Sequence, residues 1–273
     1  MSVAYPGLVA PRPRLSRPRR RGLTLGLRVT GPVALVAAWW IASATGVLSA
    51  DVLASPATVA KAARELWADG QLTAALRVSL TRAVLGLACG LTAGLVLGVI
   101  TGFSRLGEEL LDSPLQLLRA LPFLSLVPLF MVWFGIGETA RVILIAVATT
   151  FPMYVSAASG VRSVDRRLVE AMDSFGLGRW ATVREVVLPG ALPSLLAGFR
   201  LSMTLSVIAL IAAEEINSTS GLGYLMTQAQ SFSRTDILSV CVLIYGLLGL
   251  VADLVARGAE RVLMPWRPRG EAR

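Results

Sequence analysis

Long apolar stretches alternate with short polar segments along the 273 residues of this chain. Six of the apolar stretches are roughly 20 residues long, which is the length an α-helix needs to cross a ~30 Å hydrocarbon core. They are Val29–Leu48, Leu80–Phe103, Pro114–Phe134, Arg141–Gly160, Leu195–Ala213 and Ile237–Ala256. Continuous runs of this length favour helices over the shorter, alternating strands of a barrel. The pattern predicts an all-α membrane protein with six transmembrane helices.

Two polar segments carry further structural signals. In residues 51–76, Ser55 followed by Pro56 is typical of a helix start, and Gly70 is typical of a helix end. The segment Glu214–Asp236 is predicted to be a polar loop between the last two spans.

The distribution of Lys and Arg predicts the orientation. If the N-terminus lies in the cytoplasm, the inside segments contain eighteen of these residues and the outside segments contain five. Positive charge concentrates on the cytoplasmic side, so we predict that both termini are cytoplasmic. The predicted divisions are a basic tail of residues 1–28, a six-helix domain of residues 29–256 and a basic tail of residues 257–273. The net charge of +9 therefore reflects topology rather than nucleic-acid binding.

The first apolar stretch has a second interpretation. An arginine-rich segment precedes it, and Leu48–Ala50 resembles the cleavage site of an export signal. The stretch is long for a signal peptide and five further spans follow, so a retained transmembrane helix is favoured.

Composition excludes several function classes. The chain is 55% hydrophobic, has 16% charged residues and leaves no room for a soluble catalytic domain. It has no histidine, so we expect no Ser-His or Cys-His catalytic site and no metal site. It also has no glycine-rich loop ending in Lys-Ser or Lys-Thr, so we do not expect this chain to bind ATP. Cys89 and Cys241 lie in apolar spans, and we expect them to be small buried residues without a disulfide.

A charged insert, Val161–Ser194, separates the fourth and fifth spans. Two short helical patterns are interrupted at Gly176 and Gly178, and Leu188-Pro189 predicts the end of the second helix. We interpret the insert as a rigid cytoplasmic lever.

The middle of this insert predicts a protein contact. Phe175, Leu177 and Trp180 place apolar bulk around the glycine turn, as expected of anchors in a partner's groove. The alternative is an amphipathic helix lying on lipid, but four acidic residues in the insert fit an anionic surface poorly.

The insert resembles the EAA loop of ABC-importer permeases. That loop reads Glu-Ala-Ala, three residues, Gly, nine residues, Ile, one residue, Leu-Pro; here Met172 and Val186 replace the third residue and the isoleucine. The resemblance implies a type I ABC-importer permease fold and a coupling segment that docks on an ATPase subunit. The residues it assigns to coupling are Glu170, Ala171, Ser174, Phe175, Gly176, Leu177, Trp180, Leu188 and Pro189.

The sequence of the third span indicates which branch of these permeases the chain resembles. Pro122 and Pro128 precede a Trp-Phe-Gly-Ile-Gly sequence, as in the nitrate, sulfonate and taurine branch of these permeases, and the Ser-Pro-Ala-Thr-Val start at Ser55 fits the same branch. The resemblance implies a transporter of a small organic or inorganic anion in the bacterial cytoplasmic membrane. It also implies a second permease copy, two cytoplasmic ATPase subunits that bind the ATP, and an external substrate-binding protein.

Glycines recur at every fourth position of the second span: Gly86, Gly90, Gly94, Gly98 and Gly102. Such a stripe allows two helix backbones to approach closely. We expect helix packing within one subunit; a dimer contact or a moving hinge is the alternative.

Polar residues near the spans are candidates for the transport pathway. They are Ser125, Tyr154, Arg200, Ser202, Ser206 and Glu214. Each has a structural alternative: hydroxyl groups often bond to their own helix, Arg200 could reach the membrane surface, and Glu214 with Glu215 could simply be solvated.

Two alternative functions are an ion-coupled secondary carrier and a membrane scaffold that does not transport. A secondary carrier usually has an intramembrane carboxylate site and internal repeats, and we see neither in this sequence.

Overall fold

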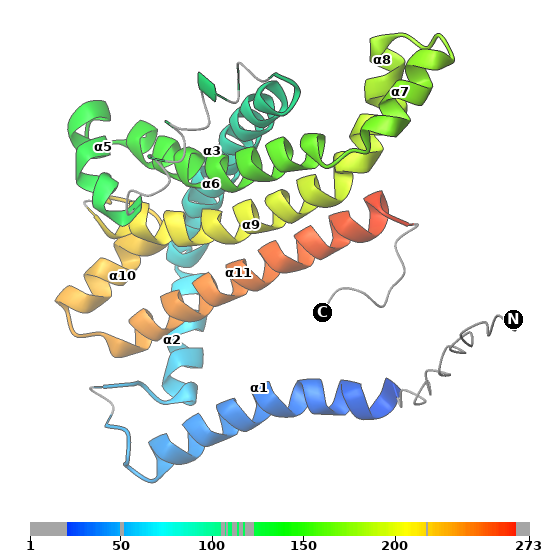
Figure 1. Ribbon diagram of the computed structural model, residues 1–273. Helices are drawn as coiled ribbons and strands as arrows, with labels where there is room; N and C mark the ends of the chain where they lie inside the picture. Colours follow the sequence, from blue (N-terminus) through cyan, green and yellow to red (C-terminus); the bar gives the residue numbers. More distant parts are fainter. Residues whose placement is uncertain are drawn as a thin grey trace, which may run out of the picture. The chain divides into compact units, whose positions relative to one another are not determined.

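The computed structural model describes residues 21–49, 52–104, 123–216 and 218–265, with single positions between 107 and 117. Every regular element among these residues is a helix (Figure 1). Contacts divide the chain into two units, Met1–Leu48 and Ser49–Arg273. The first unit contains α1 (Arg21–Ala44), so the helix already begins inside the segment predicted as a tail.

Among the residues that the structure describes, four helices of the second unit are long and apolar enough to cross a membrane. They are α3 (Gln71–Phe103), α6 (Glu138–Arg162), α9 (Leu188–Glu215) and α11 (Thr235–Leu263). All four are longer than the apolar stretches that predicted them, because each helix continues into the residues that flank its apolar stretch. Of the predicted third span, the structure describes η1 (Phe123–Leu126) and α5 (Val127–Phe134), and Pro122 lies outside the described residues.

The predicted helix in residues 51–76 is confirmed as α2 (Pro56–Ala68). The side chain of Ser55 accepts a hydrogen bond from the backbone N–H of Thr58, which satisfies a free donor of the first turn. Gly70 has φ +74°, a left-handed conformation that glycine adopts without strain, and it separates α2 from α3.

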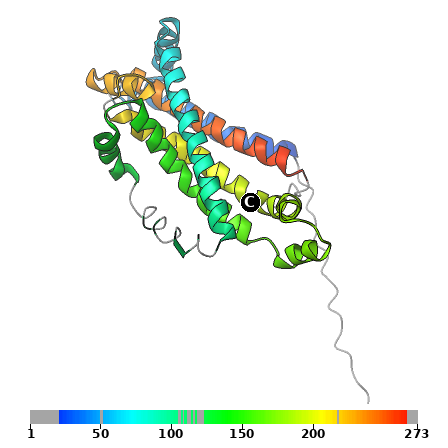
Figure 2. The ribbon, with the colours of Figure 1, turned by 90° about the horizontal axis from the view of Figure 1, so that it is seen from above.

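The glycine stripe of α3 lies against α6 of the same chain (Figure 2). A Cβ atom added at Gly98 would lie 2.6 Å from both the Ala157 Cβ and the Tyr154 carbonyl oxygen, and one at Gly102 would lie 2.7 Å from the Val161 Cβ. The other three glycines are equally close to α6. Glycine therefore lets the two backbones touch along most of their length.

The remaining helices extend this pair into a layer. α9 packs between α6 and α11, and α10 (Leu222–Ser231) packs on the end of α9 (Figure 1). Val127 and Phe130 of α5 bury their side chains with Leu144, Ala212 and Ala213 at that same end. Because α10 lies within Glu214–Asp236, this segment contains a helix and is not the polar loop that was predicted.

The charged insert projects from the opposite ends of α6 and α9 (Figure 1). It forms α7 (Arg166–Ser174) and α8 (Arg179–Thr182), and from here on the lever means residues 166–182, which are these two helices and the glycine turn between them. Between them Gly176 has φ +73°, so the glycine turn predicted here is confirmed. Asp165 caps α7 by accepting from the Arg167 backbone N–H.

The predicted helix end at Leu188-Pro189 is wrong. A π-helical turn, η2 (Val183–Val187), joins α8 to α9, so that Trp180–Glu215 is one continuous helical rod. Pro189 comes just after this turn, and its missing N–H leaves the regular hydrogen-bond pattern incomplete without ending the helix. The wider turn in front of the proline replaces the break that we expected.

The glycine contact generates a prediction with a matched control. We expect Gly98→Ala to destabilise the protein by about 2 kcal/mol, because the added methyl would collide with the backbone and side chains of α6. Gly249→Ala in α11 adds the same group where no atom lies within 4 Å, and it should be neutral or stabilising by about 1 kcal/mol through helix propensity. Thermal unfolding in detergent measures both, and equal effects would contradict the packing role.

Candidate functional site

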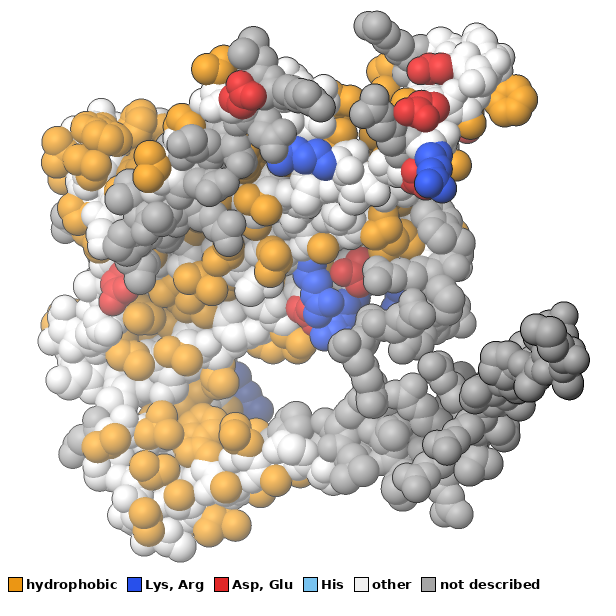
Figure 3. Space-filling view, viewed as in Figure 1, with side chains coloured by type: hydrophobic (Ala, Val, Ile, Leu, Met, Phe, Trp, Pro, Cys, Tyr) orange, Lys and Arg blue, Asp and Glu red, His pale blue; other side chains and the backbone are white. Residues whose placement is uncertain are grey.

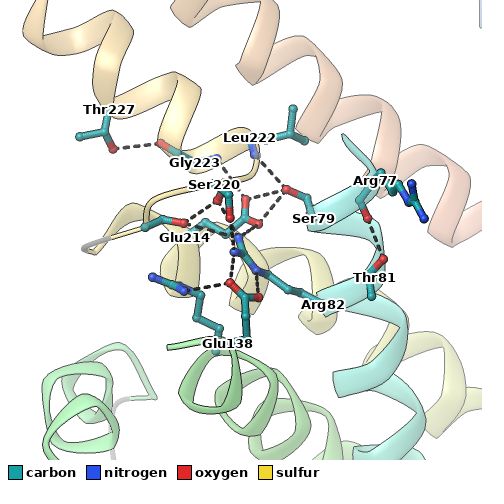
Figure 4. Close-up of polar contacts among 12 residues, drawn as sticks. Arg77, Ser79, Thr81, Arg82, Glu138, Glu214, Ser220, Leu222, Gly223 and Thr227 are labelled. Carbon is teal, nitrogen blue, oxygen red and sulfur yellow. Dashed lines mark hydrogen bonds and ion pairs between the residues drawn. The ribbon is translucent and has the colours of Figure 1, made fainter. Parts of the chain in front are cut away.

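A buried ion-pair network lies at the end of the helices that is opposite the lever (Figure 4). Its centre is Glu214 at the end of α9, whose side chain is fully buried. The carboxylate accepts hydrogen bonds from the Ser79 hydroxyl at 2.7 Å, the Arg82 Nη1 at 2.6 Å and the Tyr245 hydroxyl at 3.0 Å. One carboxylate therefore joins α3, α9 and α11.

Glu214 also holds the start of α10. The backbone N–H of Gly223 donates to the carboxylate at 3.0 Å, and the N–H of Leu222 donates to the Ser79 hydroxyl at 2.9 Å. A negative charge at a helix N-terminus is favoured by the unpaired N–H groups there. Gly221 has φ +99°, and a Cβ at that position would lie 2.5 Å from the Glu214 Oε1. The Gly-Leu-Gly sequence allows the helix to begin directly on the carboxylate.

Arg82 uses all of its hydrogen-bond donors inside this network. Its Nε and Nη2 groups donate to the two carboxylate oxygens of Glu138, and Nη1 donates to Glu214. The carbonyl oxygen and hydroxyl of Ser220 accept the remaining two N–H groups at 2.8 and 2.9 Å. Since a guanidinium has five N–H groups, none is left for an additional anion.

The charges of the network balance. Arg82 and Arg141 face Glu138 and Glu214, and Arg141 lies 3.2 Å from the Glu138 carboxylate. Glu138 is the one of the four with an exposed side chain, at 58%. It lines an open cleft of about 650 Å³ together with Arg77, Thr81 and Ser220. Solvent thus reaches the network at its edge and is excluded from its centre.

Sequence reasoning missed this network. The interpretation of Glu214 as a solvated residue is wrong, and Arg82 was not connected to any partner. The signal was available: an arginine within an apolar helix needs a carboxylate, and few acidic residues lie at that end of the spans. What the sequence could not supply is the choice of Glu214 over the adjacent Glu215, whose side chain is exposed.

Arg200 also pairs with a carboxylate from another helix. Its Nη2 donates to Asp253 of α11 at 2.8 Å, while Arg257 donates to the second oxygen of Asp253 at 2.6 Å. These charges link α9 to α11 near the middle of α9. The sequence analysis placed Arg200 either at the membrane surface or in the transport pathway, and it did not predict the ion pair with Asp253.

The other pathway candidates are dispersed. Ser202 is fully buried and donates to the Thr149 carbonyl of α6, whereas Ser206 donates to Met203 in its own helix. Tyr154 is buried and Ser125 is exposed in η1. The structure does not gather these side chains around one cavity, so their pathway roles stay predictions.

The residues predicted to couple to the ATPase lie on the lever and at the start of α9. Phe175 and Trp180 are 81% and 78% exposed, which is unusual for aromatic side chains, and Leu177 is 42% exposed beside them. Figure 3 shows apolar and acidic side chains side by side at the tip of the projecting insert. The remaining candidates follow the same backbone: Glu170, Ala171 and Ser174 on α7, and Leu188 and Pro189 at the start of α9.

The network predicts very different roles for two adjacent glutamates. Glu214→Ala would leave Arg82 with one carboxylate fewer in a buried site, so we expect a loss of about 3 kcal/mol in the free energy of unfolding. Glu215→Ala, at an exposed position, should change it by less than about 0.5 kcal/mol. Thermal unfolding in detergent compares the two variants, and indistinguishable results would rule out a stabilising network.

Comparisons with known proteins place this architecture in a family. Residues 90–264 match the family of binding-protein-dependent transport system inner membrane components. A protein of Escherichia coli (strain K12) described as an aliphatic sulfonates transport permease, SsuC, is 45% identical over 87% of this chain and 90% of its own length. The taurine transport system permease protein TauC of the same organism is 33% identical over 91% of this chain and 92% of its own.

A solved structure agrees at the level of the fold. A chain from the crystal structure of an amino acid ABC transporter with histidines has a TM-score of 0.59 and 18% sequence identity. The match covers 73% of this chain and 97% of that chain. The chain therefore belongs to the family of binding-protein-dependent transport system inner membrane components, as a multi-pass ABC transporter permease in the branch that contains the sulfonate and taurine permeases.

Proposed function

We propose that this chain forms the transmembrane pathway of an ATP-driven importer for a small anion such as an aliphatic sulfonate or taurine. It works as a homodimer of six-span subunits with cytoplasmic termini, together with two cytoplasmic ATPase subunits and an external substrate-binding protein. The observation that carries this proposal is the lever, which presents exposed aromatic side chains beyond the ends of the long helices.

The lever has the properties of a partner-binding element. Phe175 and Trp180 surround a glycine turn whose backbone conformation is fixed by hydrogen bonds from Gly176 to Asp173 and from Leu177 to Met172. Aromatic side chains on a rigid support lose little entropy on binding and often dominate an interface. Exposed acidic residues on α7 favour a protein groove over an anionic lipid surface. An ATPase subunit is the partner that fits the family.

Substrate class is inferred from the relatives rather than from a binding site. The relatives described as sulfonate and taurine permeases cover most of this chain. Arg82 has no free donor, so it is not a binding group for the anion unless the network opens. Selectivity for the anion then rests mainly on the external binding protein.

The mechanism is alternating access. ATP binding draws the two ATPase subunits together, and the levers convey that movement to the helices, which open the pathway outward. Substrate then passes from the binding protein into the pathway, and ATP hydrolysis resets it. Shifting a two-state pathway from almost fully inward to almost fully outward requires about 5.5 kcal/mol of differential binding, so the contact at the lever must be strong.

The charged groups give little support to an ion-coupled secondary carrier. Glu138 and Glu214, which lie at the ends of spans, are both occupied by Arg82. Among the described residues no cluster of acidic, cysteine or histidine side chains could hold a metal ion.

Reconstitution tests the proposal directly. The chain is expressed with its cognate ATPase and inserted into liposomes, and the binding protein is supplied outside with a radiolabelled sulfonate or taurine. We expect uptake that requires ATP inside and the binding protein outside. Uptake driven by an ion gradient without ATP would favour the secondary carrier instead.

The exposed aromatic residues of the lever generate a second test. The double variant Phe175→Ala/Trp180→Ala should weaken co-purification of the ATPase by at least about 30-fold, as expected from the loss of about 2 kcal/mol at an anchor. The control is Trp67→Ala/Phe232→Ala, which removes two other exposed aromatic residues, 61% and 76%, outside the lever. Equal loss of the ATPase in both variants would contradict a specific contact at the lever.

The glycine turn of the lever provides a third test. Gly176→Val places a β-branched residue at φ +73°, so the turn should distort, and substrate-stimulated ATP hydrolysis should fall to the basal level. Gly178→Val is the control, because Gly178 has no positive φ and no atom within 4 Å of an added Cβ. ATP hydrolysis by the reconstituted complex is measured with and without loaded binding protein. Full stimulation in the Gly176 variant would argue strongly against a shape-dependent lever.

A further inference from the structure

The backbone changes its helical form where the insert joins α9. In η2 the N–H of Leu188 donates to the carbonyl of Val183, five residues earlier, instead of the usual four. Such π turns are rare and are commonly found at functional sites. This turn contains Val186 and immediately precedes Leu188-Pro189, so it coincides with the end of the sequence motif.

Proline adds to the weakness of this turn. Pro189 has no N–H, so the carbonyl of Glu185 lacks the donor that a regular α-helix would supply. Pro193, one turn later, removes the donor for the carbonyl of Pro189 in the same way. Three departures from the regular hydrogen-bond pattern thus fall within about three turns of one rod.

This turn also lies at a boundary in packing. On its α9 side, a Cβ added at Gly190 would lie 3.1 Å from the Val164 Cγ2, and one at Gly160 would lie 3.1 Å from the Ala191 carbonyl oxygen. The start of α9 is therefore held closely against the end of α6 and against Val164, which follows α6. On the lever side, the side chains of Arg184 and Glu185 are 75% and 66% exposed. Val187 of the same turn is buried, at 6%, so the turn is packed on one side and exposed on the other.

The lever is joined to the spans not only by η2 but also by a second connection, which follows α6. After α6 ends, residues Ser163–Asp165 form a short non-helical link to α7. Two covalent connections, this link and η2, therefore join the lever to the spans.

We propose that residues Val183–Pro189 form a flexible joint at which the lever changes its angle to α9 while α9 stays packed on α6. Hinges of this kind absorb backbone changes at the ends of elements. The inference rests on the proposed function, because it assumes that an ATPase moves the lever. It gives Leu188-Pro189 a role that differs from the helix end predicted from sequence.

Hydrogen exchange in the intact complex tests the joint. The complex of this chain with its ATPase is placed in lipid nanodiscs, and amide exchange is compared without nucleotide and after trapping with ATP and vanadate. We expect the amides of Arg184–Leu188 to exchange at least about tenfold faster than those of Leu195–Phe199, and to change rate on trapping. Equal rates in the two segments, with no dependence on nucleotide, would overturn the proposal.

Two proline substitutions distinguish an effect on the flexibility of the joint from a general effect of replacing a proline in α9. Pro189→Ala supplies an N–H for the carbonyl of Glu185, so exchange at Arg184–Leu188 should slow about fivefold and the maximal rate of substrate transport should fall. Pro193→Ala is the control, since it makes the same change inside the packed part of α9 and should leave transport within about twofold of the wild type. ATPase co-purification is measured for both variants and should be unchanged.

The outcomes distinguish the joint from the proposed function. Slowed exchange with wild-type transport in the Pro189 variant would show that flexibility is not needed and would overturn the joint. Unchanged exchange in that variant would overturn the assignment of the flexibility to Pro189. Failure of the wild-type chain to bind any ATPase would instead reject the proposed function.

Discussion

The buried pair between Arg82 and Glu214 is the interaction on which one end of this protein depends. Neither charge can be left alone in an apolar surrounding, because an unpaired buried charge costs several kcal/mol. The side chains of Arg82 and Glu214 are 2% and 0% exposed, and their hydrogen bonds reach α3, α6, α9, α10 and α11. Each of these helices is therefore held at the same point, and none can leave without breaking a charge-assisted bond.

The opposite end of the second unit is organised differently. There the helices are held by close backbone contact between α6 and the start of α9, and beyond that contact the lever is exposed. The permease is thus fixed by charge at one end and left open to a partner at the other. α9 connects the two ends, because the same rod begins beside the lever and finishes at Glu214.

Much of this organisation was predictable from sequence, and the remainder has identifiable physical reasons. The α2 cap at Ser55 and the glycine turn at Gly176 were predicted because each depends on one residue and its own backbone. The stripe from Gly86 to Gly102 predicted close packing but not its partner, since many helices could accept it.

The predictions failed where a residue acts through distant or unusual contacts. Glu214 was predicted to line the pathway or to be solvated, and its place in a buried network was missed because its partners Ser79, Arg82 and Tyr245 are far away in the chain. Pro189 was interpreted as a helix end because the π turn that accommodates it has no simple sequence signature. The span count and the orientation depend on a bilayer and on residues that the structure does not describe, so they stay predictions.

The glycine contact between α3 and α6 has a consequence for assembly. The glycines of the α3 stripe each face an atom of α6, and the residues next to them in the chain are all larger. Sliding one helix by a single residue would therefore push larger side chains, such as Leu87, Leu91 and Leu95, into those positions. The two helices therefore recognise one register and reject its neighbours. During membrane insertion they can form a correctly aligned pair before α9 and α11 arrive, and the later helices then find a finished template.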